Sequence, residues 1–216
     1  MRYWLCCLVP IVALASATHA ADFFANFEDE TAGSPPALGS VDGPAETAAG
    51  FRVVDASTNP VNPLQGKALL VEDQAHETAP ILRIPVGNFI RGEADAKIKL
   101  LEGTCRIALG NKAGAASMLM FADTGQISVK SETGWIACDQ PCDPTRPLEV
   151  KIQFDCERGT YTATLNGQPV TFQKGNPEFP FRKSSLTALS EIIVQAGDGE
   201  SGGSRAVFDD FGISEH

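Results

Sequence analysis

Apolar and polar residues alternate along much of this chain, which is the pattern of β-strands with one buried and one solvated face. In 93–100, two alanines, an isoleucine and a leucine alternate with two acidic residues and two lysines. The stretch 148–155 repeats this with Leu, Val, Ile and Phe on one side. In 160–165, threonines alternate with Tyr, Ala and Leu. We therefore predict three half-buried strands at these positions.

The residues between the strands predict tight turns. Asn166-Gly167 follows the third strand, and this pair supplies the positive φ angles of a two-residue hairpin. Residues 147–173 therefore predict a three-stranded antiparallel meander. Gly or Pro separates most of the other strand candidates, which are 22–28, 51–54, 67–71, 79–85, 104–110, 116–122, 126–131, 134–138, 187–195 and 205–213. With no convincing amphipathic helix, the pattern indicates an all-β, two-sheet antiparallel β-sandwich of the jelly-roll type.

The first twenty residues follow a different pattern. Arg2 precedes an almost wholly apolar run, and small residues flank Ala20. This predicts a secretory signal peptide over 1–20, because the run is shorter than the ~20 residues of a membrane span. We expect 21–216 to be a single exported domain (extracellular, periplasmic or cell-surface) that does not insert into a membrane.

Charge narrows the range of partners. The chain carries a formal net charge of −10. Such a chain repels the phosphate backbone, so we expect no nucleic-acid partner.

Four cysteines follow the predicted signal peptide, and an even number in an exported chain favours disulfides. Cys138 and Cys142 flank a turn-prone Asp-Gln-Pro, so we expect them to pair, which leaves Cys105 to pair with Cys156. Three pairings remain open. A zinc site or free thiols are the weaker alternatives, because there is one close pair and no His beside it.

Several motifs, in order, resemble one family. They are Phe24-Ala25-Asn26-Phe27-Glu28-Asp29-Glu30, Gly66-Lys67-Ala68-Leu69, the hairpin over 148–167, and Ala206-Val207-Phe208-Asp209-Asp210-Phe211-Gly212-Ile213. Together they resemble the concanavalin A-like lectin/glucanase superfamily, including laminin G-like modules. The resemblance implies a jelly roll whose first and last strands lie near each other. This fold hosts lectins, glycosidases, lyases and adhesion modules, so it does not decide the function.

The last strand carries the best candidate for a metal site. Strict alternation would place Asp209 on one face with Val207, Phe211 and Ile213. A carboxylate on an apolar face must be hydrogen-bonded, paired or bound to metal. The resemblance implies a structural calcium where the first and last strands meet, with Glu28 and Asp209 as matching ligands. The alternative is that backbone N–H groups cap Asp209 without an ion.

The sequence does not contain a recognisable set of catalytic residues. Glucanases of this superfamily carry Glu-x-Asp-x-Glu on one strand, and here Lys97 follows Glu93-x-Asp95, which removes the proton donor. The alternative is a solvated strand face. His76 lies in a polar stretch and His216 is the last residue, so neither is placed to serve a nucleophile. We expect Trp135 to fill the core or cover a disulfide rather than stack on a sugar.

These observations favour a secreted, non-catalytic jelly-roll module that binds a polysaccharide, a glycoconjugate or another surface or matrix component, with a structural calcium. The alternatives are a carbohydrate-active enzyme with an unrecognised active site, and a structural envelope protein without a small ligand. A concave face lined by polar and aromatic side chains would favour the first two. Two carboxylates at catalytic separation on that face would favour the enzyme.

Overall fold

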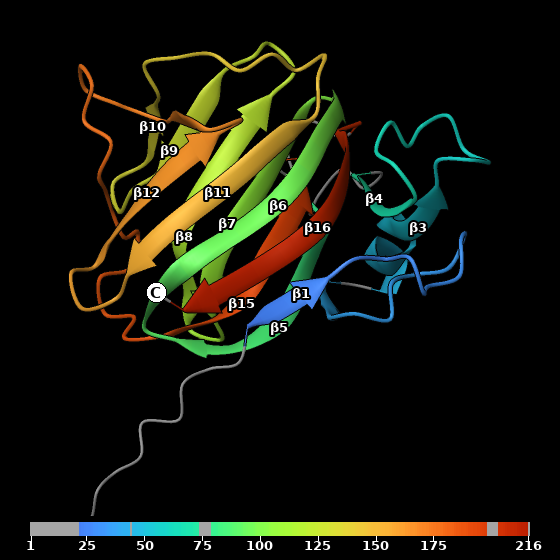
Figure 1. The fold of residues 1–216 in the computed structure, drawn as a ribbon, viewed down its shortest axis with the longest axis horizontal. Helices are drawn as coiled ribbons and strands as arrows, with labels where there is room; N and C mark the ends of the chain where they lie inside the picture. Colours follow the sequence, from blue (N-terminus) through green and yellow to red (C-terminus); the bar gives the residue numbers. More distant parts are fainter. Residues whose placement is uncertain (1–21, 44, 74–78, 198–202, 216) are drawn as a thin grey trace, which may run out of the picture.

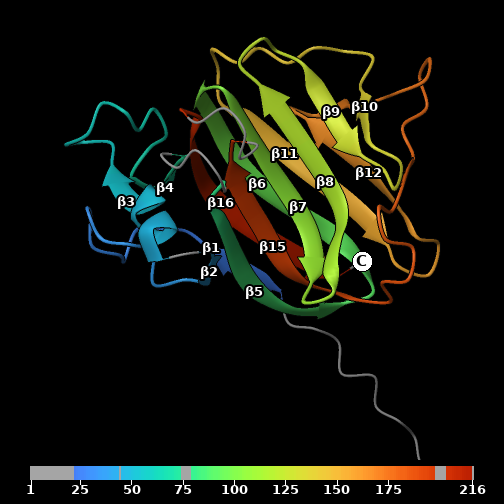
Figure 2. The ribbon, with the colours of Figure 1, turned by 180° about the vertical axis from the view of Figure 1, so that it is seen from behind.

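The computed structural model describes residues 22–43, 45–73, 79–197 and 203–215. The predicted signal peptide, His76 and His216 lie outside these ranges. Two antiparallel sheets pack face to face, so the predicted all-β sandwich is confirmed (Figures 1 and 2). Within the described ranges the one helix is a short 3-10 turn, Ala45–Gly50, and no helix is long and apolar enough to cross a membrane.

Sheet A faces the viewer in Figure 1 and has the order β13-β12-β11-β6-β16-β4-β3. Two short strands join it, since β1 pairs with β16 and β14 pairs with β12. Its strands are β1 (Phe23–Ala25), β3 (Phe51–Asp55), β4 (Lys67–Glu72), β6 (Arg91–Glu102), β11 (Leu148–Asp155), β12 (Thr160–Leu165), β13 (Gln168–Pro169), β14 (Phe179–Pro180) and β16 (Arg205–Glu215).

Sheet B faces the viewer in Figure 2 and has the order β10-β9-β8-β7-β15-β5-β2. Its strands are β2 (Ser40–Asp42), β5 (Ile81–Phe89), β7 (Thr104–Asn111), β8 (Gly114–Ala122), β9 (Ile127–Lys130), β10 (Trp135–Ala137) and β15 (Leu189–Ala196). All of the pairings within the two sheets are antiparallel.

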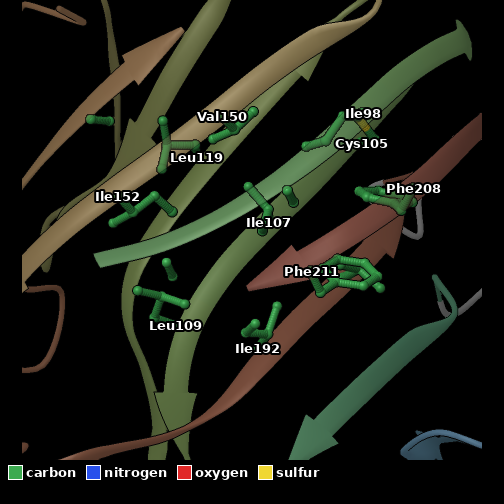
Figure 3. Close-up of a cluster of buried hydrophobic side chains, with 14 of the residues drawn as sticks. Ile98, Cys105, Ile107, Leu109, Leu119, Val150, Ile152, Ile192, Phe208 and Phe211 are labelled. Carbon is green, nitrogen blue, oxygen red and sulfur yellow. The ribbon is translucent and has the colours of Figure 1, made fainter. Parts of the chain in front are cut away.

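The core fills the space between the two sheets (Figure 3). Sheet A contributes Ile98, Val150, Ile152, Phe208 and Phe211, and sheet B contributes Ile107, Leu109, Leu119 and Ile192. The two-residue alternation decides which side chains enter it. Along β11 every second residue is buried and the residues between are exposed, so the pattern read from 148–155 is confirmed.

The predicted meander is also confirmed. Strand β11 pairs with β12, and β12 pairs with β13. Asn166 and Gly167 have φ angles of 49° and 77°, the left-handed values that a tight two-residue hairpin requires.

The first and last strands meet, because β1 pairs with the C-terminal half of β16. Strand β16 pairs with β6 along its length, but this ladder shifts register between Asp209 and Gly212. Asp210 has φ 51° in this bulge. The extra residue brings Phe208 and Phe211 both into the core, so strict alternation was wrong here: Asp209 does not share a face with Phe211.

Candidate binding face and cation pocket

The outer face of sheet B is built from two cross-strand rows. The first runs through Ile81, Gln195, Arg106, Met120 and Ser128, and the second through Arg83, Ile193, Ala108 and Met118. We call these nine residues, together with Trp135, the sheltered face. They come from β5, β15, β7, β8, β9 and β10, so segments far apart in the sequence form one surface.

Side chains on this face are shielded although they point away from the core. Ala108 is 1% exposed, Ile193 and Ser128 are each 6% exposed, and Gln195 is 9% exposed. On the outer face of sheet A, Lys97, Glu149, Lys151 and Gln153 are exposed. The centre of the sheltered face is therefore more fully covered by its neighbouring side chains than the β6–β11 strip of sheet A.

Trp135 belongs to this face and not to the core, so the first of its two expected roles, filling the core, was wrong. The second, covering a disulfide, stays a prediction. Trp135 pairs with Lys130 on the neighbouring strand, at an outward position, and is half-buried. The Arg106 guanidinium carbon and the Lys130 ammonium each lie 5.1 Å from the centroid of its ring. These cation–π contacts fix the ring orientation.

The opposite side of the face is held by an ion-pair network. Arg83 donates to Glu191 at 2.9 Å and also contacts Asp42 on the edge strand β2. Glu191 is buried. Between Arg83 and Trp135 the floor is apolar, formed by the buried cluster of Ala108, Ala115 and Ile193 with Met118 and Ile81 beside it. The face thus combines an aromatic ring, cations and an apolar floor.

Glu28 and Asp209, the predicted calcium ligands, line one hollow of about 390 Å³ together with Asn26, Asp210 and Lys97. The hollow lies where β16 leaves β4 and begins to pair with β1. It is therefore at the expected junction of the first and last strands. Whether an ion binds there stays a prediction.

The Asp209 carboxyl suits a cation. It is 5% exposed, and its Oδ1 atom is buried without a hydrogen-bond partner among the described residues. Burial, together with the nearby negative charges of Asp210 and Glu28, raises its pKa to about 6. A bound cation would relieve this cost. Within the described chain no three His, Cys, Asp or Glu side chains cluster as metal ligands, so Asn26 and main-chain carbonyls would have to complete the shell.

Glu28 is positioned by strand β4. Its Oε1 atom accepts the Lys67 main-chain N–H at 2.9 Å. The Lys67 ammonium donates to the carbonyls of Glu28 and Glu30 at 2.6 and 2.7 Å. Gly66 leaves room for the carboxylate, because a Cβ there would lie 1.9 Å from Glu28 Oε1. The segment 28–30 is thus tied to β4 independently of any ion.

The Glu93-x-Asp95 motif lies on the outer face of sheet A. Lys151 and Gln153 donate to Glu93 at 2.6 and 3.0 Å, and Lys97 forms an ion pair with Asp210 at 2.7 Å. Burial raises the pKa of Asp95, which packs over the bare backbone of Gly212. Charges of both signs alternate here, which is the arrangement of a solvated strand face.

A second aromatic lies near this strip. Phe24 on β1 is 64% exposed and borders a hollow of about 280 Å³ with Asp95, Lys97 and Lys151. The sequence did not predict an exposed Phe24, because a single aromatic residue in a three-residue strand carries no periodic pattern.

The four cysteines are free thiols in the structure. Cys105 pairs with Ala196 at one end of β15, while the Cys156 thiol contacts the Phe89 carbonyl, and Phe89 pairs with Leu189 at the other end. These ends are roughly 20 Å apart at 3.3 Å per residue, whereas a disulfide needs Cα atoms about 4.4–6.8 Å apart. The predicted Cys105–Cys156 pairing is therefore wrong for this structure.

Cys138 and Cys142 lie beside the same hairpin. Their main-chain N–H groups donate to Ile127 and Gly125 at 2.9 and 2.8 Å. A disulfide between them stays a prediction.

No protein-family model and no curated protein matches the chain. Solved structures do share its fold. A sialidase superposes with a TM-score of 0.65 at 10% identity, over 91% of this chain but 19% of the sialidase chain. The Crh5 transglycosylase in complex with NAG gives 0.54 at 15% identity, covering 91% of this chain and 85% of that one. A carbohydrate esterase from the Shiga toxin-encoding bacteriophage phi24B gives 0.50 at 15% identity, covering 81% and 88%.

At these identities the likeness shows the fold alone. These neighbours are compatible with a sandwich of the jelly-roll type. The three are named as carbohydrate-active proteins, and this chain spans 19% of the sialidase.

Proposed function

We propose that this protein is a secreted, non-catalytic module of the concanavalin A-like type that binds a glycan on the sheltered face. The observation that carries the proposal is the placement of Trp135 on the outer face of sheet B, beside an apolar floor and charged side chains that contact its ring. A pyranose ring offers one apolar face and a rim of hydroxyls. An indole ring with flanking donors and acceptors complements both.

The groups on this face fit binding better than hydrolysis. Glycoside hydrolysis needs two carboxyl groups about 5–9.5 Å apart, one of them able to give up a proton. Two carboxylates of the sheltered face and its border, Glu191 and Asp42, contact Arg83. A third, Glu132, lies in the exposed hairpin between β9 and β10. The carboxylates paired with Arg83 can also accept hydrogen bonds from hydroxyls.

We further propose a structural calcium in the Glu28–Asp209 hollow. Its role would be to join the first strand to the last on sheet A, whereas the sheltered face belongs to sheet B. The support is the buried, unpartnered Asp209 oxygen next to a second carboxylate. Calcium would neutralise both charges without taking part in chemistry.

Binding to a panel of polysaccharides and glycoconjugates tests the glycan proposal. The purified protein is compared with Trp135→Ala and with Phe24→Ala, which removes the exposed aromatic of sheet A. We expect binding to at least one glycan that Trp135→Ala weakens about tenfold or more and Phe24→Ala leaves unchanged. Loss in Phe24→Ala alone would move the site to sheet A. Binding to no glycan would favour the structural role, and release of reducing ends would favour the enzyme.

A further inference from the structure

We propose that Cys105 and Cys142 form a disulfide that fastens the segment 138–147, between β10 and β11, to the end of the core. This pairing differs from the Cys138–Cys142 link that the sequence favoured, and it does not depend on the glycan function. It follows from which of the other cysteines can reach Cys105.

Cys105 points into the core from the start of β7, where it is fully buried (Figure 3). A cross-strand row joins it to Phe121 on β8, and Phe121 to Ile127 on β9. Beyond this row, the Cys138 main-chain N–H donates to the Ile127 carbonyl at 2.9 Å. Cys138 is thus three strand spacings from Cys105, about 14 Å, whereas the Cα atoms of a disulfide lie about 4.4–6.8 Å apart. Cys105 cannot pair with Cys138, and the topology of β15 already excludes Cys156.

Cys142 lies over the same end of the sandwich as Cys105. Its main-chain N–H donates at 2.8 Å to the carbonyl of Gly125, in the turn between β8 and β9. This turn contacts the connection between β6 and β7. The Asp123 main-chain N–H donates to the Gly103 carbonyl at 2.8 Å, and the Asp123 carboxylate accepts the Gly103 N–H at 2.9 Å. Gly103 is two residues before Cys105, so these contacts bring Cys142 to the start of β7.

The side chains of Cys105 and Cys142 both contact the core. Cys142 is half-buried and packs against the hydrophobic cluster that contains Cys105. Burial raises the pKa of the Cys105 thiol, and the charge of a Cys142 thiolate raises it further. For Cys138, the pKa is raised by burial and then by Asp139. Cys142 is therefore close enough to Cys105 to act on it electrostatically.

The link would strengthen a connection between the two sheets. The segment 138–147 leaves sheet B after β10 and enters sheet A at β11. On the way, the Lys99 ammonium of β6 donates to the Pro144 carbonyl at 2.5 Å. A bond from Cys142 to β7 restricts the unfolded chain and so stabilises the folded one.

The four cysteines are thiols in the structure, so the link needs an oxidant. A small-molecule disulfide such as oxidised glutathione supplies it. The thiolate of Cys142, the less buried of the two, displaces one glutathione thiolate, and the Cys105 thiolate then displaces the second. One S–S bond breaks and one forms. The two electrons and the two cysteine protons pass to the two released glutathione molecules.

Disulfide mapping of the purified protein tests the pairing. The protein is incubated with oxidised and reduced glutathione until its content of free thiols is constant, then alkylated in denaturant and digested without reductant. We expect one linked pair of peptides that contains Cys105 and Cys142, with Cys138 and Cys156 alkylated. A Cys138–Cys142 link, or Cys105 recovered in alkylated form, would overturn the proposal.

Two serine variants separate the link from the packing of each thiol. The melting temperature of each protein is measured in the glutathione mixture and in excess reductant, so that each variant is its own reference. We expect the mixture to raise it by about 10 °C in the parent protein and in Cys138→Ser, and to leave Cys142→Ser unchanged. Equal melting temperatures for the parent protein in the two buffers, or a rise that Cys142→Ser retains, would contradict the link.

Discussion

The Arg106 guanidinium carbon lies 5.1 Å from the centroid of the Trp135 ring, although two strands separate β7 from β10 in sheet B. Three strand spacings amount to about 14 Å. The two side chains must therefore extend toward each other over β8 and β9. This contact makes an edge-strand residue part of the sheltered face, and it gives the face its aromatic surface.

The first prediction concerns fluorescence. The chain has two tryptophans, and the other, Trp4, falls in the predicted signal peptide. In the exported chain Trp135 would be the sole indole fluorophore. A bound glycan that excludes water from the ring should shift its emission to shorter wavelength, with a saturable dependence on ligand concentration. Phe24→Ala should give the same titration, whereas an unchanged spectrum at saturating ligand would place the site elsewhere.

The second prediction concerns Asp209 and pH. Burial raises its pKa from 3.8 to about 6, so the folded state holds a proton that the unfolded state releases. The stability this group contributes is therefore present below about pH 4 and lost as pH rises through about 6. In chelator at pH 7, Asp209→Asn should raise the free energy of unfolding by about 2 kcal/mol. Asp29→Asn, an exposed neighbour of Glu28, should have little effect.

With calcium added, we expect Asp209→Asn to be less stable than the parent protein, the reverse of the order in chelator. The ion should stabilise the parent protein and leave Asp209→Asn unchanged, because the variant lacks a charged ligand. Melting curves with calcium and with chelator measure both effects. Identical curves for the parent protein in the two conditions would contradict the calcium proposal.

The third prediction compares two glycines. Gly66 has φ 73° and Gly159 has φ 65°, so alanine strains the backbone at either position by about 1 kcal/mol. A Cβ at Gly66 would lie 1.9 Å from Glu28 Oε1, whereas one at Gly159 meets nothing within 4 Å. Gly66→Ala should therefore destabilise more and also abolish any calcium-dependent shift. Equal losses in the two variants would show that Gly66 does not position Glu28.

The fourth prediction concerns the cysteines. Burial raises the pKa of the Cys138 thiol to about 12 and that of Cys156 to about 11, so both should resist alkylation in the folded protein at pH 7. Peptide mapping of the purified protein under non-reducing conditions measures the pairing. A Cys105–Cys156 link would contradict the topology of β15, while a Cys138–Cys142 link is compatible with it.

Strands that bury one face were predictable, because strict alternation of apolar and polar residues over eight positions fits a half-buried strand and does not fit a helix. Strands β6, β11 and β12 follow the predicted faces. Strands β2 and β14 were missed, since three and two residues are too short to show a period. Strand β15 is buried on both faces, and its central Ile192-Ile193-Val194 does not alternate, so the sequence gives no sign of which side chains form the sheltered face.

The site could be predicted in part. The first and last strands meet as the motif order implied, so Glu28 and Asp209 line one hollow. The bulge at Asp210 was not predictable from alternation, because an aspartate in the left-handed region leaves no trace in the pattern. Trp135 and Arg106 are 29 positions apart in the sequence. Their contact depends on strand order, which no local pattern encodes.

The central claim is that the sheltered face binds a glycan through Trp135. In a protein that lacks residues 1–20, one indole N–H should give one side-chain peak in a ¹⁵N–¹H correlation spectrum. Titration with a polymer that binds in the panel tests the claim directly. The account predicts that this peak shifts and saturates at the affinity measured by binding. A polymer that binds the protein while the peak stays in place would contradict it.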